Sequence, residues 1–228
     1  VLEKSINTGA VFAQQQLGGD LFVDYLEKFG FFEPTGIDLP ETSSTNKAIK
    51  TKREVNLATG AFGQGVVITP IQLIKSYCAL ANNGKLVTPH LVKQKIDSDN
   101  KISHPFQDPE EDQVISSETA SKVTSMLISV VENGFGKAAK VPGYFIAGKT
   151  GTAQVSYGSL GINKSGYSDE TIQSFIGFAP AYNPQFLILV KLDNPNTKTA
   201  EYSAIPMFQE LAEYIIRQYQ IPFDYEET

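Results

Sequence analysis

The sequence predicts an α+β fold, in which helices come first, strands follow one another, and a helix ends the chain. Up to about residue 134, apolar residues recur at the three- and four-residue spacing of helices. Between residues 141 and 194 the period shortens to that of strands, and between 208 and 219 the helical spacing returns. Because consecutive strands favour antiparallel pairing, we expect an antiparallel sheet flanked by helices.

The first helices are indicated by apolar spacing and by residues that begin or end helices. An apolar-rich stretch at residues 10–17 is ended by Gly18 and Gly19, and Asp20 is suited to cap a second helix that stops at Gly30. The next 26 or so residues, 31–56, are polar and irregular in pattern. We expect no regular element there.

Two further helices carry clearer signals. Thr69 is suited to cap a helix with Pro70 in its first turn and a stop at Gly84. Residues 85–106 read as short strands and turns around the sequence DSDN. Another helix begins near Ser117 and ends at Gly134, with its apolar residues on one face.

The second part of the chain has three strand candidates. They are residues 144–155, 171–180 and 185–194, and the turn AYNP separates the last two. The final helix is marked by six apolar or aromatic positions at helical spacing: Phe208, Leu211, Ala212, Ile215, Ile216 and Tyr219. We therefore divide the chain, 1–228, into a mainly helical region, 1–140, and a region of sheet strands and a C-terminal helix, 141–228, without expecting independent domains.

Composition and charge argue against several classes of function. The chain has 228 residues, 41% of them hydrophobic, and a formal net charge of −6. Nucleic-acid binding needs a basic face, and no cluster of Lys and Arg supplies one. The single cysteine, Cys78, excludes an internal disulfide, and the two histidines, His90 and His104, both stand beside proline in loop-like stretches. We expect no nucleic acid, no metal and no cofactor.

The beginning of the chain suggests a piece of a longer polypeptide. The first residue is Val1, and a helical pattern runs within ten residues of it. The sequence contains neither a signal peptide nor a run of apolar residues long enough to span a membrane.

The stretch GYFIAGKT, residues 143–150, fits the phosphate-loop pattern G-x-x-x-x-G-K-[ST]. Such a loop needs a buried strand before it and a helix after it, so that the helix N-terminus faces the phosphates. Here GFGKAAKVP precedes it, and GTAQVSYGS, which opposes a helix, follows it. FLILVKLD does resemble the apolar strand that ends in a magnesium-positioning aspartate, although Lys191 interrupts it. We interpret the match as a coincidence, and nucleotide binding is the remote alternative.

Read with the next two residues, the same stretch gives Lys149-Thr150-Gly151-Thr152 on a strand. Side chains alternate along a strand, so Thr150 and Thr152 would share a face and could both bind a substrate carboxylate. Lys149 would add positive charge, Gly151 would allow close approach to the backbone, and the amide of Thr152 could join an oxyanion hole. Alone, the triplet K-T-G is explained equally well as an ordinary strand end.

The triplet does not stand alone. K-T-G, S-x-x-K and S-D-N together mark penicillin-interacting serine enzymes, and Ser5-Ile6-Asn7 supplies an S-x-N just before a helix. Six longer stretches decide the matter: KSINTG, FGFFEPTGIDLP, TGAFGQGVVITPIQL, ANNGKLVTPHLV, VPGYFIAGKTGTAQ and SFIGFAPAYNPQFLILVKLDNP. In the same order as in that family, they resemble the transpeptidase domain of class B penicillin-binding proteins, from Ser5 to about Tyr219.

The resemblance implies a penicillin-binding, serine β-lactamase-like fold, truncated at its N-terminus, and peptidoglycan D,D-transpeptidase activity. In that family a serine attacks the penultimate D-alanine carbonyl of a stem peptide and forms an acyl-enzyme, which an amine of a neighbouring stem peptide then resolves. β-Lactams mimic the D-alanyl-D-alanine end and acylate the same serine.

The resemblance also assigns roles to residues of this chain. Ser5 would relay protons to the leaving amine and contact Lys149, and Asn7 would hydrogen-bond the amide backbone of the substrate. Lys149, Thr150 and Thr152 would hold the terminal carboxylate on the strand that contains Gly151, with the Thr152 N–H as an oxyanion donor.

The nucleophile motif S-x-x-K is missing from its expected place before Ser5. The pattern occurs at residues 44–47 and 98–101, in polar, loop-like segments that lack the helix needed to hold serine and lysine one turn apart. Turn composition explains both matches. We therefore expect the nucleophile, together with two strands of the family's sheet, to lie outside this chain, which would leave residues 185–193 as an exposed apolar edge.

The resemblance further implies partners and a location. The partners would be peptidoglycan stem peptides, β-lactam antibiotics, a cell-wall glycosyltransferase, and proteins of cell division or elongation. The location would be the extracytoplasmic face of the bacterial cytoplasmic membrane, with the anchor outside this chain.

Alternatives within the same fold remain open. A serine β-lactamase needs a group that activates water for deacylation, which the sequence does not identify, and a β-lactam sensor domain would match the longer stretches less well. A non-catalytic relative that only binds stem peptide or a partner would lack S-x-x-K upstream as well.

Overall fold

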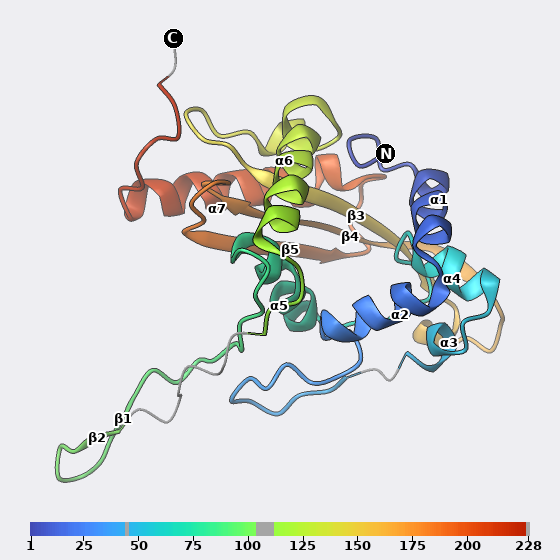
Figure 1. Cartoon of the computed structure of the whole chain (residues 1–228), viewed down its shortest axis with the longest axis horizontal. Coiled ribbons are helices and arrows are strands. Elements are labelled where there is room, and N and C mark those ends of the chain that lie inside the picture. The colour runs from blue at the N-terminus through green and yellow to red at the C-terminus, as the bar shows by residue number, and fades with distance from the viewer. Residues whose placement is uncertain (44–45, 104–111, 227–228) are drawn as a thin grey trace.

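The computed structural model describes residues 1–43, 46–103 and 112–226 (Figure 1). The α+β prediction is confirmed. In chain order the elements are α1 Asn7–Leu17, α2 Gly19–Lys28, α3 Lys47–Lys50, α4 Glu54–Gly60, α5 Pro70–Ala81, β1 Lys95–Ile96, β2 Ile102–Ser103, α6 Ser117–Asn133, η1 Lys137–Ala139, β3 Ala147–Ser156, η2 Gly158–Leu160, β4 Tyr167–Ala179, β5 Phe186–Asp193, η3 Ala200–Tyr202 and α7 Ala204–Gln218.

An antiparallel sheet with the strand order β3-β4-β5 forms the centre of the molecule. Its two faces are covered by different helices because side chains alternate along β4. Phe175 packs edge-to-face on Phe208 of α7, with ring centroids 4.6 Å apart. Phe178 points the other way, into a cluster with Leu127 of α6, and its ring centroid lies 6.1 Å from that of Tyr77 in α5. The sheet therefore lies between α7 and the pair α5 and α6 (Figure 1).

Hydrophobic clusters join the two regions of the chain. Leu127 and Ile128 of α6 share one cluster with Ala147 and Phe178 of the sheet. Val131 of α6 belongs to the larger cluster between the sheet and α7. The division at residue 140 stays a prediction, since these clusters cross it.

Two helix starts illustrate how local signals succeed or fail. Thr69 forms a capping box: its side chain accepts from Gln72 N, while the Gln72 side chain accepts from Thr69 N. The prediction that Asp20 caps the second helix was wrong, because Gly18 is the N-cap of α2. Asp20 lies in the first turn, where a carboxylate favours the helix dipole, and it pairs with Lys52.

The expectation that residues 31–56 lack regular structure was also partly wrong. They contain α3 and the beginning of α4. Ile49 and Leu57, from these two helices, are buried against Val23 of α2. The Asn46 side chain anchors the start of α3, since it donates to the Val67 carbonyl and accepts from the Val67 amide, each at 2.8 Å. Helices of one or two turns are too short to show a hydrophobic period, so packing determines them.

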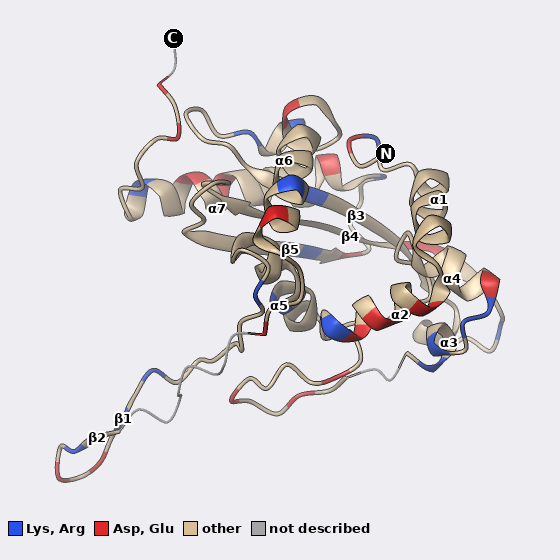
Figure 2. Ribbon diagram, viewed as in Figure 1, with Lys and Arg blue, Asp and Glu red and all other residues tan. Residues whose placement is uncertain are grey.

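Charged residues of both signs are interspersed along the chain (Figure 2). Exposed pairs such as Lys122 with Glu118 on α6 follow the i, i+4 spacing of a helix. Within the described residues no helix is long and apolar enough to cross a membrane. The same part of the chain holds no cluster of three or more potential metal ligands.

The C-terminal tail is pinned to the segment that leads into β3. The Asp224 carboxylate accepts from Phe145 N at 2.8 Å, and Asp224 N donates to the Gly143 carbonyl at 2.9 Å. Tyr144 Oη donates to the Ile221 carbonyl at 2.6 Å. Gly143 has φ of +82°, which favours glycine at this turn. The tail therefore supports the strand that carries Lys149.

Tyr77 has a buried hydroxyl that lacks a hydrogen-bond partner among the described residues. Burial raises the pKa of this phenol. An unsatisfied buried hydroxyl costs about 1 to 3 kcal/mol, so Tyr77→Phe is expected to raise the free energy of unfolding by about 1 kcal/mol in urea titrations. Tyr144→Phe is the matched control: it removes a hydrogen bond that is made and should lower stability by about the same amount. Equal losses for both variants would contradict the assignment.

The strand β5 lies at one edge of the sheet and carries an apolar run at residues 186–190. The first four of these residues are partly buried and Val190 is buried. An apolar edge strand offers unpaired backbone groups to other chains. We predict that the isolated chain self-associates in light-scattering measurements and that Leu189→Lys reduces the association. A monodisperse monomer at high concentration would contradict the prediction.

Candidate active site

A short N-terminal turn carries Ser5 to the sheet because it is held against the end of α6. The Glu3 carbonyl accepts from Phe135 N at 2.9 Å, and the Glu3 carboxylate accepts from Ser129 Oγ. A Cβ atom at Gly134 would lie only 2.4 Å from the Glu3 carbonyl oxygen. Glycine at this position therefore permits the close backbone contact that fixes the turn.

Ser5 and Asn7 stand on either side of the start of α1. Asn7 is the first residue of the helix, which begins three residues earlier than predicted, and Ile6 is its N-cap. Ser5 is exposed and has φ of +49°, a left-handed conformation that costs a serine about 1 kcal/mol or more. Such strain is typical of functional positions.

Lys149, on β3, meets Ser5 directly. Its Nζ donates to Ser5 Oγ at 2.9 Å, to the Thr150 carbonyl at 2.9 Å and to Thr150 Oγ1 at 3.2 Å. These three bonds use the three donors of an ammonium group. Burial lowers the pKa of Lys149, and none of its partners among the described residues is a carboxylate. The result is a partly desolvated cation held by neutral oxygens, which favours a bound anion.

The register of β3 with β4 separates the side chains of the K-T-G-T stretch. Thr150 lies opposite Phe175 and Thr152 opposite Gln173, on the face covered by α7. Lys149 alternates with them and lies on the other face. Thr150 is half-buried and Thr152 is exposed at the outer edge of the sheet, since β3 pairs only with β4 among the described strands.

Gly151 is opposite Ser174, and a Cβ atom at Gly151 would lie 2.6 Å from Ser174 Oγ. Gly151→Ala is therefore expected to lower the free energy of unfolding by about 1 kcal/mol through overpacking. Ser174→Ala removes the obstructing oxygen and leaves a Cβ at 4.0 Å, so Gly151→Ala should be neutral in that background. A double-mutant cycle by thermal unfolding tests this coupling, and additive effects would contradict it.

The phosphate-loop alternative is not compatible with the backbone. Gly148, Lys149 and Thr150 are paired with β4 in register, so their amides do not curl around an anion. A strand continues to Ser156 where a phosphate loop requires a helix.

Neither downstream S-x-x-K match forms a nucleophile site in the described residues. Residues 98–101 join β1 to β2 in a hairpin that extends away from the sheet (Figure 1). The Asp97 carboxylate accepts from Asp99 N and Lys101 N at 2.9 Å each, which explains the turn. In the other match, Ser44 and Thr45 lie outside the described residues, as does His104.

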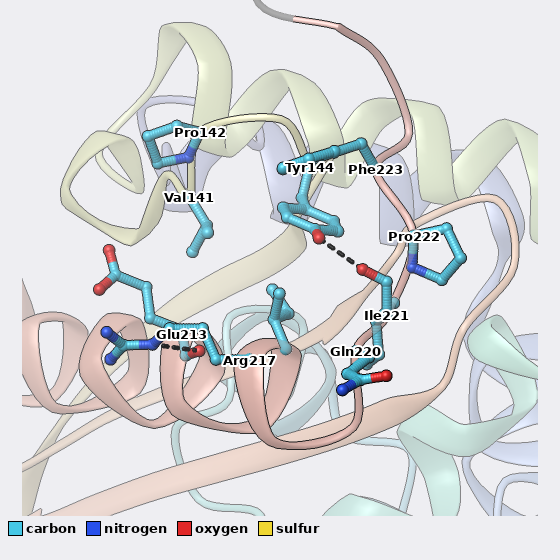
Figure 3. A pocket seen from close by; sticks show the side chains of 10 residues that line it. Val141, Pro142, Tyr144, Glu213, Arg217, Gln220, Ile221, Pro222 and Phe223 are labelled. Carbon is cyan, nitrogen blue, oxygen red and sulfur yellow. Dashed lines mark hydrogen bonds between the residues drawn. The ribbon is translucent and has the colours of Figure 1, made fainter.

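A cavity of about 440 Å³ lies beside the turn that leads into β3, between the end of α7 and the C-terminal tail (Figure 3). Tyr144 and Ile221 meet across it, and Arg217 lies at its border. A larger hollow of about 1070 Å³ adjoins the same tail. Ser5 and Lys149 line neither of these two cavities. Ser5 is exposed and Lys149 is half-buried.

The fold and the paired serine and lysine define a domain of the transpeptidase type. The family model described as the penicillin binding protein transpeptidase domain matches residues 1–213, and the chain belongs to this family.

Named relatives agree with this assignment. The chain is 40% identical over 198 residues to "Stage V sporulation protein D" of Bacillus subtilis (strain 168), covering 86% of this chain and 30% of that protein. It is 31% identical to "Peptidoglycan D,D-transpeptidase FtsI homolog" of Mesostigma viride, covering 97% and 40%. The crystal structure of penicillin binding protein 3 from Mycobacterium tuberculosis with ampicillin superimposes with a TM-score of 0.90 at 33% identity, covering 99% and 52%. The chain thus spans 30% to 40% of the length of these curated relatives.

Proposed function

We propose that this chain is the part of a peptidoglycan D,D-transpeptidase that carries the S-x-N and K-T-G groups. The attacking serine and its S-x-x-K lysine belong, in this proposal, to a segment outside the chain. The observation that carries the proposal is the 2.9 Å contact between Lys149 Nζ and Ser5 Oγ. It joins two motifs that are 144 residues apart, at an open edge of the sheet.

The carboxylate of a D-alanyl-D-alanine end would bind beside Lys149. A cation whose partners are neutral oxygens attracts an anion, and the attraction is stronger where water is partly excluded. The hydroxyls of Thr150 and Thr152 would complete the carboxylate site from the neighbouring face of the strand.

The amide of Thr152 would stabilise the oxyanion. The Thr150 carbonyl accepts from Lys149 Nζ. This bond supports the view that the Thr150 carbonyl points to the edge of β3 that is not paired with β4. In an antiparallel strand the N–H and C=O of one residue point to the same side, and residues two apart repeat that direction. The Thr152 N–H would therefore point to the open edge, toward a developing negative charge.

Ser5 would carry the proton during acyl transfer. The oxygen of the attacking serine, which lies outside this chain, bonds to the carbonyl carbon of the penultimate D-alanine, and the C–N bond to the last D-alanine breaks. The proton of the serine passes through its lysine and the Ser5 hydroxyl to the leaving amine. An amine of a second stem peptide then attacks the ester, which forms the cross-link and frees the serine. Asn7 would hydrogen-bond the amide backbone of the substrate.

The same reasoning extends to ligands, partners and location. A β-lactam would acylate the serine by opening its ring C–N bond, so the leaving group would stay attached to the acyl-enzyme. Stem peptides, a glycosyltransferase and proteins of division or elongation are the proposed partners, at the extracytoplasmic face of the membrane. A serine β-lactamase is the weaker candidate, since no residue is assigned to activate water.

The test is labelling by a fluorescent penicillin, followed by intact-mass measurement and peptide mapping. It compares this chain with the extended protein, meaning the longer natural polypeptide that includes the segment before Val1. We expect one adduct on the extended protein, on a serine before Val1, and none on the short chain. Labelling of Ser44 or Ser98 would overturn the assignment of the nucleophile. Absence of labelling in the extended protein would indicate a non-catalytic relative.

A further inference from the structure

Gln173 is a polar residue in the middle of β4, directly opposite Thr152 in the register of the sheet. Its side chain is completely buried, with an exposed fraction of 0%. Buried amides are expensive unless they are fully hydrogen-bonded, so a glutamine at this position calls for an explanation.

Both ends of the Gln173 amide are satisfied. Nε2 donates to the Thr197 carbonyl at 2.6 Å and to Thr171 Oγ1 at 3.1 Å. Oε1 accepts from Ser203 Oγ at 2.6 Å and from Thr197 Oγ1 at 3.1 Å. These four bonds match the two donors and two acceptor positions of an amide. Because a carbonyl can only accept, the contact with the Thr197 carbonyl fixes which end of the amide is the nitrogen.

These bonds tie the segment 194–203, which links β5 to α7, to the sheet next to Thr152. Asn194 N adds a bond to the Thr171 carbonyl at 2.8 Å. Ser203 is the N-cap of α7 but caps no helix amide with its side chain, and its hydroxyl donates to Gln173 instead. The helix η3 within the segment, Ala200–Tyr202, contacts β3.

We propose that Gln173 is a positioning residue for the Thr152 strand. It holds the segment 194–203 against β3 and thereby fixes Thr152, whose N–H and hydroxyl face the substrate in the proposed function. Directly opposite residues on one face of a sheet have Cβ atoms about 4.5 to 5.5 Å apart, so Gln173 lies close enough to support Thr152. Because Gln173 is completely buried, it acts without touching substrate. The inference rests on the proposed function, since it concerns the same site.

The first test replaces Gln173 by leucine in the extended protein and measures the second-order rate constant of β-lactam acylation. Misplacement of reacting groups by an ångström costs up to about a hundredfold, and we expect a loss of about tenfold. The matched control is Gln72→Leu on α5. Gln72 is also buried, at 1% exposed, and its amide bonds the Glu33 carbonyl at 2.7 Å and the Thr69 amide at 2.9 Å. We expect Gln72→Leu to lower the thermal midpoint while acylation stays within about twofold of wild type.

A second variant, Gln173→Glu, separates positioning from general destabilisation. Its carboxyl can donate to the Thr197 carbonyl only when it is protonated, and burial favours the protonated form. The ratio of its acylation rate constant to that of wild type should therefore rise as pH falls from about 8 to 5. Amide hydrogen exchange of residues 150–154 and 194–203 should speed up in Gln173→Leu and not in Gln72→Leu.

The outcomes of the two proposals can be told apart. If the extended wild type is not acylated, the proposed function fails, and hydrogen exchange alone then decides whether Gln173 fixes the two segments. If wild type is acylated and Gln173→Leu is equally fast, or if Gln72→Leu is slowed as much, the positioning role is overturned. A pH-independent ratio for Gln173→Glu would also overturn it.

Discussion

Replacing Lys149 by methionine is expected to stabilise the folded chain while it reduces β-lactam acylation of the extended protein by at least about a hundredfold. The two effects have one cause. Lys149 is a partly buried cation whose partners among the described residues are all neutral oxygens. Its charge therefore costs folding energy and is available to a ligand carboxylate. An apolar side chain of similar length should raise the free energy of unfolding by about 1 kcal/mol near neutral pH. Urea titration and penicillin labelling measure the two effects separately.

The stability difference should depend on pH in a defined direction. Burial lowers the pKa of Lys149 from its ordinary value of 10.5. Below the lowered pKa, the lysine is charged in both the folded and the unfolded chain, and the full cost is present. Between the two pKa values the unfolded chain binds more protons, so wild-type stability rises with pH. The advantage of Lys149→Met should therefore shrink as pH rises through the folded pKa toward 10.5.

Lys191→Met is the control for this prediction. Lys191 lies on β5 of the same sheet, is exposed, and pairs with Asp193. Its replacement should change stability by less than about 0.5 kcal/mol and leave acylation unchanged. A loss of stability in Lys149→Met at neutral pH would show that the lysine contributes more through its hydrogen bonds than it costs through burial.

Removal of the Ser5 hydroxyl should reduce acylation of the extended protein by about a hundredfold, the range expected when a proton-transfer group is lost. Ser5→Ala and Ser5→Gly both remove the oxygen that lies 2.9 Å from Lys149 Nζ. They should be equally slow and still differ in stability, because the residue has φ of +49°. Glycine accepts this conformation and should be about 1 kcal/mol more stable than alanine there.

Ser98→Ala provides the control, since this serine lies in the hairpin between β1 and β2. The extended protein with Ser98→Ala should be acylated by the penicillin at the wild-type rate. Equally slow acylation in Ser5→Ala and Ser5→Gly, in spite of their different stabilities, would support the proton-relay role. Unchanged acylation in Ser5→Ala would leave the contact with Lys149 as a structural feature only.

The elements with strong local signals could be predicted from the sequence. The helix α5 starts at Pro70 after the Thr69 cap, as predicted, although it ends at Ala81 and not at Gly84. The helix α6 begins at Ser117 and has Gly134 as its C-cap, as predicted. The strands β4 and β5 were recognised from their apolar runs and the turn between them. The short helices α3 and α4 were missed because they have no hydrophobic period, and packing of Ile49 stabilises them.

The candidate site could be predicted only in its parts. The motifs indicated Ser5 and Lys149, and the family resemblance implied their contact. No local signal showed how the N-terminal turn reaches the sheet. The position of this turn depends on the contact of Glu3 with Gly134 and Phe135, which are distant from it in the sequence. Gln173 was missed for a different reason. A glutamine between strand-forming residues reads as a solvent-facing position, and only the register shows that it is buried opposite Thr152.

The pinned C-terminal tail has a practical consequence for protein engineering. Asp224 and Tyr225 are hydrogen-bonded to the turn at Gly143 and to Phe145. Removal of the residues after 220 would therefore loosen the segment that leads into the Lys149 strand, although no deleted atom belongs to the site. The N-terminus lies near α1 and α6, whereas the C-terminal tail extends past α7 (Figure 1). A purification tag or fluorescent reporter is therefore best fused after residue 226, where it leaves the hydrogen bonds of Asp224 and the pair of Ser5 and Lys149 undisturbed.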